Sequence, residues 1–129
     1  CADGKYVSLG SIEPQFYAQL LAGLGLSADA LPSQMDRSSF PAMHTLFAER
    51  FATKTRDQWT AVFAGSDACV TPVLTWSEAA RSDHLRARET LVTRHGADQA
   101  APAPRFSRTP PNPVGAPPEG ATPVDRIDW

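Results

Sequence analysis

The spacing of hydrophobic positions changes near the start of the chain. From Tyr6 to Leu9 apolar and polar side chains alternate, which predicts a short, half-buried strand. After a glycine–serine break the apolar residues recur every three or four positions, which predicts a helix over residues 14–24. Pro14 suits the first helical position, where a backbone N–H would have no intrahelical partner, and Gly25 suits the left-handed residue after a helix.

The same spacing predicts two more helices. One begins near Ser38 or Ser39, and we expect its apolar face to be buried. That face consists of Phe40, Met43, His44, Phe47 and Phe51. The other follows a capping box, in which the side chains of Thr55 and Gln58 each satisfy the backbone N–H of the other residue. We expect this third helix to stop at Gly65 and to bury Trp59, Val62 and Phe63.

The second half of the chain is predicted to hold shorter elements. First come a strand at Cys69 and Val70 that Pro72 ends, a helix begun by a second capping box at Thr75, and a helix that Asp83 caps and that runs through Arg88. Two strands follow, formed by Leu91–Thr93 and the residues before Pro102, with a turn at His95 and Gly96.

Proline changes the character of the chain towards its end. Most of its 12 prolines lie at or beyond position 102, and proline cannot donate to a strand ladder. We therefore predict an extended or disordered tail over residues 109–129 and one small domain over residues 1–108. The fold class is α+β, with about three main helices packed on a small β-sheet.

Composition excludes several classes of function. A net charge of -2 gives no reason to expect nucleic acid as a partner, because phosphate binding requires clustered Lys and Arg. No apolar run approaches the roughly 18–20 residues of a membrane span. Only two cysteines occur, which is no disulfide framework, so we expect a reduced, cytoplasmic setting. The chain begins with Cys1 and not with Met, and we expect it to be part of a longer protein.

Glu13 is the first candidate for chemistry. A carboxylate in a first helical turn is stabilised by the helix dipole by about 0.3–1 kcal/mol, and this structural role alone explains many such residues. The functional alternative is a base, or a group that orients a base, at the edge of a cleft.

Histidine and cysteine give weaker signals. His44 lies in an apolar helical face, where a hydrogen-bonded core histidine is the expected role, and the histidine spacing matches no zinc pattern. We therefore expect no metal site. Cys69 is expected to be a buried structural thiol, because a nucleophilic cysteine needs a neighbouring base that the sequence does not indicate.

Three ungapped motifs resemble the α-methylacyl-CoA racemases of the family III CoA-transferase superfamily. They are Gly10–Tyr17 (with Ile12-Glu13-Pro14-Gln15-Phe16-Tyr17 inside it), Asp67–Leu74 and Pro102–Pro110. The resemblance places the chain at the C-terminal small domain of a two-domain subunit. It implies a preceding Rossmann-like large domain that holds the coenzyme A of the substrate, with no further cofactor.

The resemblance also implies the reaction and the partners. A 2-methylacyl-CoA thioester would lose its α-proton, pass through an enolate and be reprotonated on the other face. The active site would lie between the large domain of one subunit and the small domain of another, in an interlocked homodimer. Glu13 matches a small-domain glutamate that orients a histidine of the large domain, and the isolated segment would be inactive.

Two other functions stay open. One is a family III acyl-CoA transferase, in which an aspartate of the large domain acts as the nucleophile. The other is a non-catalytic dimerisation or interaction module that has kept the fold.

Overall fold

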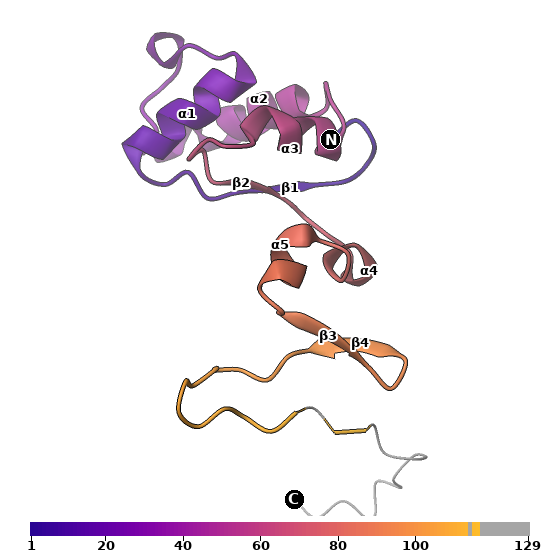
Figure 1. Ribbon diagram of the computed structural model, residues 1–129. Coiled ribbons are helices and arrows are strands. Elements are labelled where there is room, and N and C mark those ends of the chain that lie inside the picture. The colour runs from indigo at the N-terminus through magenta and orange to yellow at the C-terminus, as the bar shows by residue number, and fades with distance from the viewer. Residues whose placement is uncertain (114, 117–129) are drawn as a thin grey trace, which may run out of the picture. The chain divides into compact units, whose positions relative to one another are not determined.

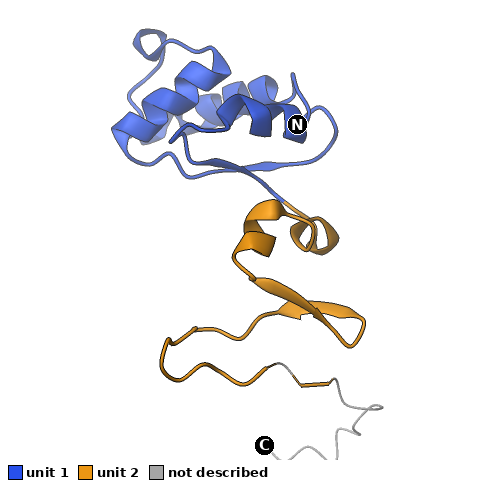
Figure 2. Cartoon of the chain, viewed as in Figure 1, with its two compact units in different colours: residues 1–73 blue, residues 74–129 orange. Residues whose placement is uncertain are grey.

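The computed structural model describes residues 1–113 and 115–116. These residues fall into two compact units, the first Cys1–Val73 and the second beginning at Leu74 (Figure 2). The predicted domain boundary between residues 108 and 109 is a different one, and it stays a prediction.

The first unit contains three helices and one pair of strands. In chain order they are β1 (Val7–Leu9), α1 (Pro14–Leu24), α2 (Phe40–Phe51), α3 (Arg56–Phe63) and β2 (Val70–Pro72). Two short 3-10 turns, Ala28–Ala30 and Arg37–Ser39, lie between α1 and α2. β1 and β2 pair antiparallel, with Val7 opposite Pro72 and Leu9 opposite Val70. The helices lie on one side of this strand pair (Figure 1), which confirms the predicted α+β class.

Local sequence signals set the ends of these helices. Pro14 is the first residue of α1, and Gly25 ends the helix with φ of 67°. The predicted capping box at the start of α3 is present: the Gln58 N–H donates to Thr55 Oγ1 at 3.2 Å, and the Thr55 N–H donates to Gln58 Oε1 at 2.9 Å. Each bond satisfies a backbone donor that the first helical turn leaves free.

The core of the first unit forms where the three helices meet. Its buried members are Leu20, Leu24, Phe51, Trp59, Phe63 and Ala68. Trp59 ties α2 to α3, because its indole Nε1–H donates to the Phe51 carbonyl at 2.9 Å and its ring centroid lies 5.1 Å from that of Phe51. Buried indoles need such a hydrogen-bond partner.

Three residues of α2 and α3 that were predicted to be buried are exposed. Phe40 is 49% exposed and His44 is exposed, although both lie on the same side of α2 as the buried Phe51. Periodicity predicts which side of a helix faces the core, but not how far along the helix other elements cover that side. Phe40 lies about 16 Å from Phe51 along the axis. Val62 is 43% exposed because it lies at the edge of the α3 face that Trp59 and Phe63 define.

The second unit contains α4 (Trp76–Ala79), α5 (Asp83–Ala87) and a hairpin of β3 (Leu91–Arg94) and β4 (Ala97–Ala100). The predicted turn at His95 and Gly96 is present, with φ of 54° and 77°. The predicted cap at Asp83 is wrong: this residue is the first of α5, and Ser82 precedes it without a side-chain cap bond.

No described residue of the second unit is fully buried. Residues 109–113 form no helix or strand, while most of the tail predicted over residues 109–129 lies outside the described residues. Within the described part of the chain, no helix is long and apolar enough to cross a membrane.

Candidate functional site around Glu13

Glu13 is the residue that caps α1. Its backbone is extended, with φ of -74° and ψ of 145°, and its carbonyl accepts hydrogen bonds from the N–H groups of Phe16 at 3.1 Å and Tyr17 at 3.0 Å. Its side chain makes no cap bond and is exposed. The carboxylate therefore lies just before the helix and not within its first turn, and its oxygens bond to none of the described residues.

The turn before Glu13 is held from two sides. From the β2 side, the Gly10 N–H donates to the Cys69 carbonyl at 2.9 Å, and the buried hydroxyl of Ser11 donates to the Ala68 carbonyl. From the loop after α1, the Gln34 side-chain amide donates to the carbonyls of Ser11 and Ile12, at 2.9 Å each. A free carboxylate thus follows a backbone segment whose position is fixed.

An apolar cavity of about 400 Å³ adjoins this turn. Its lining includes Ile12, Gln34, Met35 and Phe40, together with Tyr17 of α1. Burial raises the pKa of the Tyr17 phenol, and its ring lies 6.5 Å from that of Phe47, measured between centroids. Glu13 itself does not line the cavity. The arrangement is an apolar hollow at the turn that leads into Glu13.

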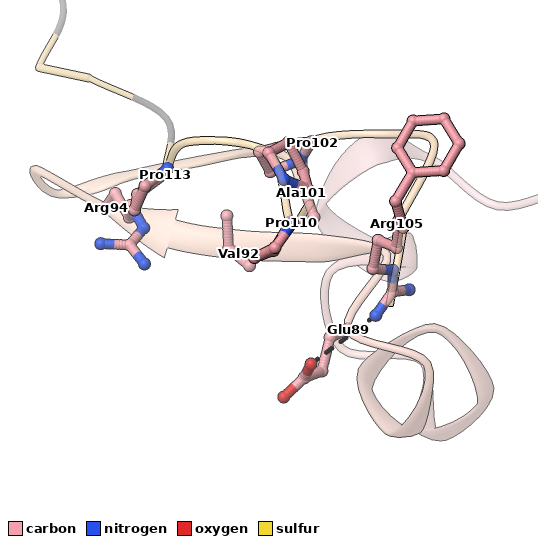
Figure 3. Close-up of a pocket in the computed structure, with 10 residues that line it drawn as sticks. Glu89, Val92, Arg94, Ala101, Pro102, Arg105, Pro110 and Pro113 are labelled. Atoms are coloured by element: carbon pink, nitrogen blue, oxygen red, sulfur yellow. Dashed lines mark ion pairs between the residues drawn. The ribbon is translucent and has the colours of Figure 1, made fainter. Parts of the chain in front are cut away.

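A second hollow lies in the second unit and contains no predicted site residue. It has a volume of about 380 Å³ and lies between the β3–β4 hairpin and the proline-rich segment that follows it (Figure 3). Arg105 pairs there with Glu89 at 3.6 Å and also donates to the Arg88 carbonyl. The Arg94 side chain lies at the other end of this hollow (Figure 3). The motif Pro102–Pro110 forms part of its wall, but the sequence did not indicate the hollow, because the other wall residues come from the hairpin and only the fold brings the two segments together.

The sequence predicted a buried thiol at Cys69, and this prediction is wrong. It is exposed, lies outside β2 and has φ of 53°, a backbone conformation that few residues other than glycine adopt. Its Sγ donates to the Asp67 carbonyl at 3.4 Å. The strand prediction failed by one residue, because Cys69 forms the bend that leads into β2.

None of the three histidines is bonded to Glu13. His44 lies on α2, His84 on α5 and His95 in the hairpin turn. Within the described residues there is no group of three or more His, Cys, Asp or Glu side chains that could hold a metal ion. Within the described residues, no imidazole is bonded to the Glu13 carboxylate.

The sequence of the chain defines its family. The profile of CoA-transferase family III matches residues 1–122, so the chain belongs to this family. Among curated proteins it is 50% identical to an α-methylacyl-CoA racemase of Mus musculus and 46% identical to one of Homo sapiens, over 110 residues in each case. It is also 36% identical over 75 residues to a CaiB/baiF CoA-transferase family protein of Caenorhabditis elegans.

The comparisons cover most of this chain but little of its relatives. The two racemase alignments span 84% of the chain and 29% of the length of each racemase. The nematode alignment spans 56% of the chain and 20% of that relative. The predicted resemblance to a segment of a racemase is thus confirmed.

Proposed function

We propose that this chain supplies the small-domain wall of an active site shared between two subunits of an α-methylacyl-CoA racemase. The full-length enzyme would interconvert (2R)- and (2S)-2-methylacyl-CoA thioesters in the cytoplasm as an interlocked homodimer. The observation that carries the proposal is the identity of 46–50% with two proteins that bear this name.

The chemistry is the removal and return of one proton. The thioester carbonyl acidifies the α-carbon, and the enolate that forms is reprotonated on its opposite face. Inversion needs an acid/base group on each face, and in this proposal a histidine and an aspartate of the large domain provide them. The substrate brings its own coenzyme A, and no other cofactor takes part.

Glu13 would act on the histidine. Its carboxylate is exposed, has no partner among the described residues and follows a fixed turn, so it is available to accept a hydrogen bond from an imidazole N–H. Such a bond selects one tautomer of the ring, and the negative charge stabilises the imidazolium and raises the pKa of the histidine. Glu13 is therefore proposed as a positioning residue for the base.

The test is Glu13→Gln in the full-length protein. We expect turnover to fall by about one to two orders of magnitude, the size of a general acid/base contribution. The acid limb of the pH profile should move to lower pH, because the histidine loses the charge that raises its pKa. The assay follows α-proton exchange of a 2-methylacyl-CoA with deuterated water.

Two controls belong to this test. Glu49→Gln removes another exposed glutamate of the same unit and should leave turnover unchanged. The isolated chain of residues 1–129 should catalyse no exchange, and measurable exchange would mean that it contains a base of its own. Unchanged turnover and an unchanged pH profile in Glu13→Gln would return Glu13 to a structural role.

A second candidate function is an acyl-CoA transferase, which the name of the matching family and of the nematode relative favours. Its nucleophile would be a carboxylate of the large domain, and coenzyme A would move from the thioester to a free carboxylic acid. Incubation with 2-methylacyl-CoA and an isotope-labelled carboxylic acid separates the two activities. Labelled acyl-CoA without α-deuteration would favour the transferase.

A further inference from the structure

We infer that Gln34 is a positioning residue that sets the direction of Glu13. This inference rests on the proposed function and adds to it a second residue, which lies in a loop and has no charge. It follows from one geometric fact: a single side-chain amide donates to the two consecutive carbonyls that precede Glu13.

The two hydrogen bonds of Gln34 can orient Glu13 because they lie directly before it in the chain. Gln34 Nε2 lies 2.9 Å from the Ser11 carbonyl oxygen and 2.9 Å from the Ile12 carbonyl oxygen. Two neighbouring carbonyls that point to one donor fix two consecutive peptide planes, and the second of these planes contains the backbone N and Cα of the next residue. The next residue is Glu13, whose own side chain has no bond to any described residue.

The other bonds at this turn hold it from the opposite side. Ser11 donates to Ala68 and Gly10 donates to Cys69, so the strand side of the turn is fixed without Gln34. Loss of Gln34 should therefore leave the fold in place and free only the segment from Ile12 to Glu13. A half-exposed amide that bonds to backbone on a surface contributes little to stability, so its loss should not unfold this unit.

The experiment is a double-mutant cycle in the full-length protein with α-deuterium exchange as the assay. Gln34→Met keeps the length of the side chain and removes both donors. We expect kcat to fall about threefold to tenfold with little change in KM, because substrate contacts remain while the base is misaligned. In a Glu13→Gln background the same change should have no further effect on kcat, because Gln34 acts through Glu13.

The control variant is Gln99→Met, which removes a glutamine amide that donates to a backbone carbonyl, that of Arg94, in the other unit. It should leave kcat and KM unchanged. Gln34→Asn is the second variant in case Gln34→Met fails to fold: its shorter side chain cannot reach both carbonyls, and we expect a decrease in kcat in the same direction. Thermal unfolding of each variant shows whether the fold is retained.

The outcomes separate this inference from the proposed function. Equal losses from Gln34→Met in the wild-type and Glu13→Gln backgrounds would mean that Gln34 only supports the fold, and would overturn the inference. An effect of Glu13→Gln without any effect of Gln34→Met would overturn the inference and leave the proposed function standing. If Glu13→Gln itself has no effect, the proposed role of Glu13 is refuted, and the inference about Gln34, which rests on that role, is refuted with it.

Discussion

The contact between α1 and α3 predicts that replacing a helical glycine by alanine destabilises this protein, although the same replacement usually stabilises a helix. Gly23 lies inside α1, and a Cβ atom built on it would overlap Phe63 Cε1 and lie 2.8 Å from Phe63 Cζ. Ordinary contacts of this kind begin at 3.4 Å, so Gly23→Ala requires α1 and the Phe63 ring to separate by about 1 Å.

The magnitude follows from two opposing terms. Alanine in a helix interior is about 1 kcal/mol better than glycine, which favours the variant. Overpacking a well-packed core costs about 1–3 kcal/mol, and Phe63 has little room to move because it is 5% exposed and its ring stacks on Trp59 with centroids 5.9 Å apart. The difference is a net loss of about 0–2 kcal/mol, and the confinement of Phe63 places the expected value towards the upper end. Each kcal/mol lost should lower Tm by about 4–8 °C.

Thermal and urea unfolding of three variants test this reasoning. Ala22→Gly, at the exposed neighbouring position, changes helix propensity in the opposite direction and should also destabilise the protein, by about 1 kcal/mol. Phe63→Leu should relieve the clash, so that the double variant with Gly23→Ala loses less stability than the sum of the single variants. A higher Tm for Gly23→Ala would refute the close approach of the two helices.

Two further predictions concern the start of α3. Thr55→Ala removes one half of the capping box and should lower the free energy of unfolding in urea by about 1 kcal/mol. The control Thr45→Ala, at an exposed position within α2, should change it by less than about 0.5 kcal/mol. Equal effects of the two variants would contradict the role of the cap. Desolvation acts to raise the pKa of Asp3, but the backbone N–H groups of Arg56 and Lys5 donate to its carboxylate and outweigh this effect, so the pKa is lowered. The contribution of Asp3 to stability is therefore present above about pH 4 and is lost as the pH falls further. Asp3→Asn should therefore lower the unfolding midpoint at neutral pH and lose this difference in strong acid; a difference that persists at low pH would contradict the assignment.

Short-range signals in the sequence predicted the secondary structure well. The capping boxes at Thr55 and Thr75, Pro14 and Gly25 all act within one helical turn of their own position, and the structure confirms each of them. Such signals do not depend on which element packs against which. This is why the bounds of α1 agree with the prediction at both ends.

Structural features that depend on contacts with distant parts of the chain were not predicted from the sequence. Burial of Phe40 requires an element above that end of α2, and none of the described elements covers it. The bend at Cys69 depends on its pairing with Gly10, far away in the sequence. Gln34 lies in a loop without periodicity, and only the fold brings its amide to the carbonyls of Ser11 and Ile12.

The surroundings of Glu13 constrain how it can act. A carboxylate and an imidazolium that meet in water attract each other by only about 1 kcal/mol or less, because solvent screens the pair. An orienting role of the proposed size requires that water be excluded from the pair. The apolar cavity at the turn before Glu13 fits this condition, because Ile12 is 74% exposed, Met35 is 73% exposed and both line it.

Exposed apolar residues gathered at one place are typical of a surface that another protein surface covers. In the proposed active site the large domain would cover them and would bring the histidine at the same time. The same contact would then exclude water and complete the pair, so the carboxylate would strengthen the base only in the assembled enzyme. On this proposal the isolated chain would show no activity, even though the turn before Glu13 is already held by Gln34.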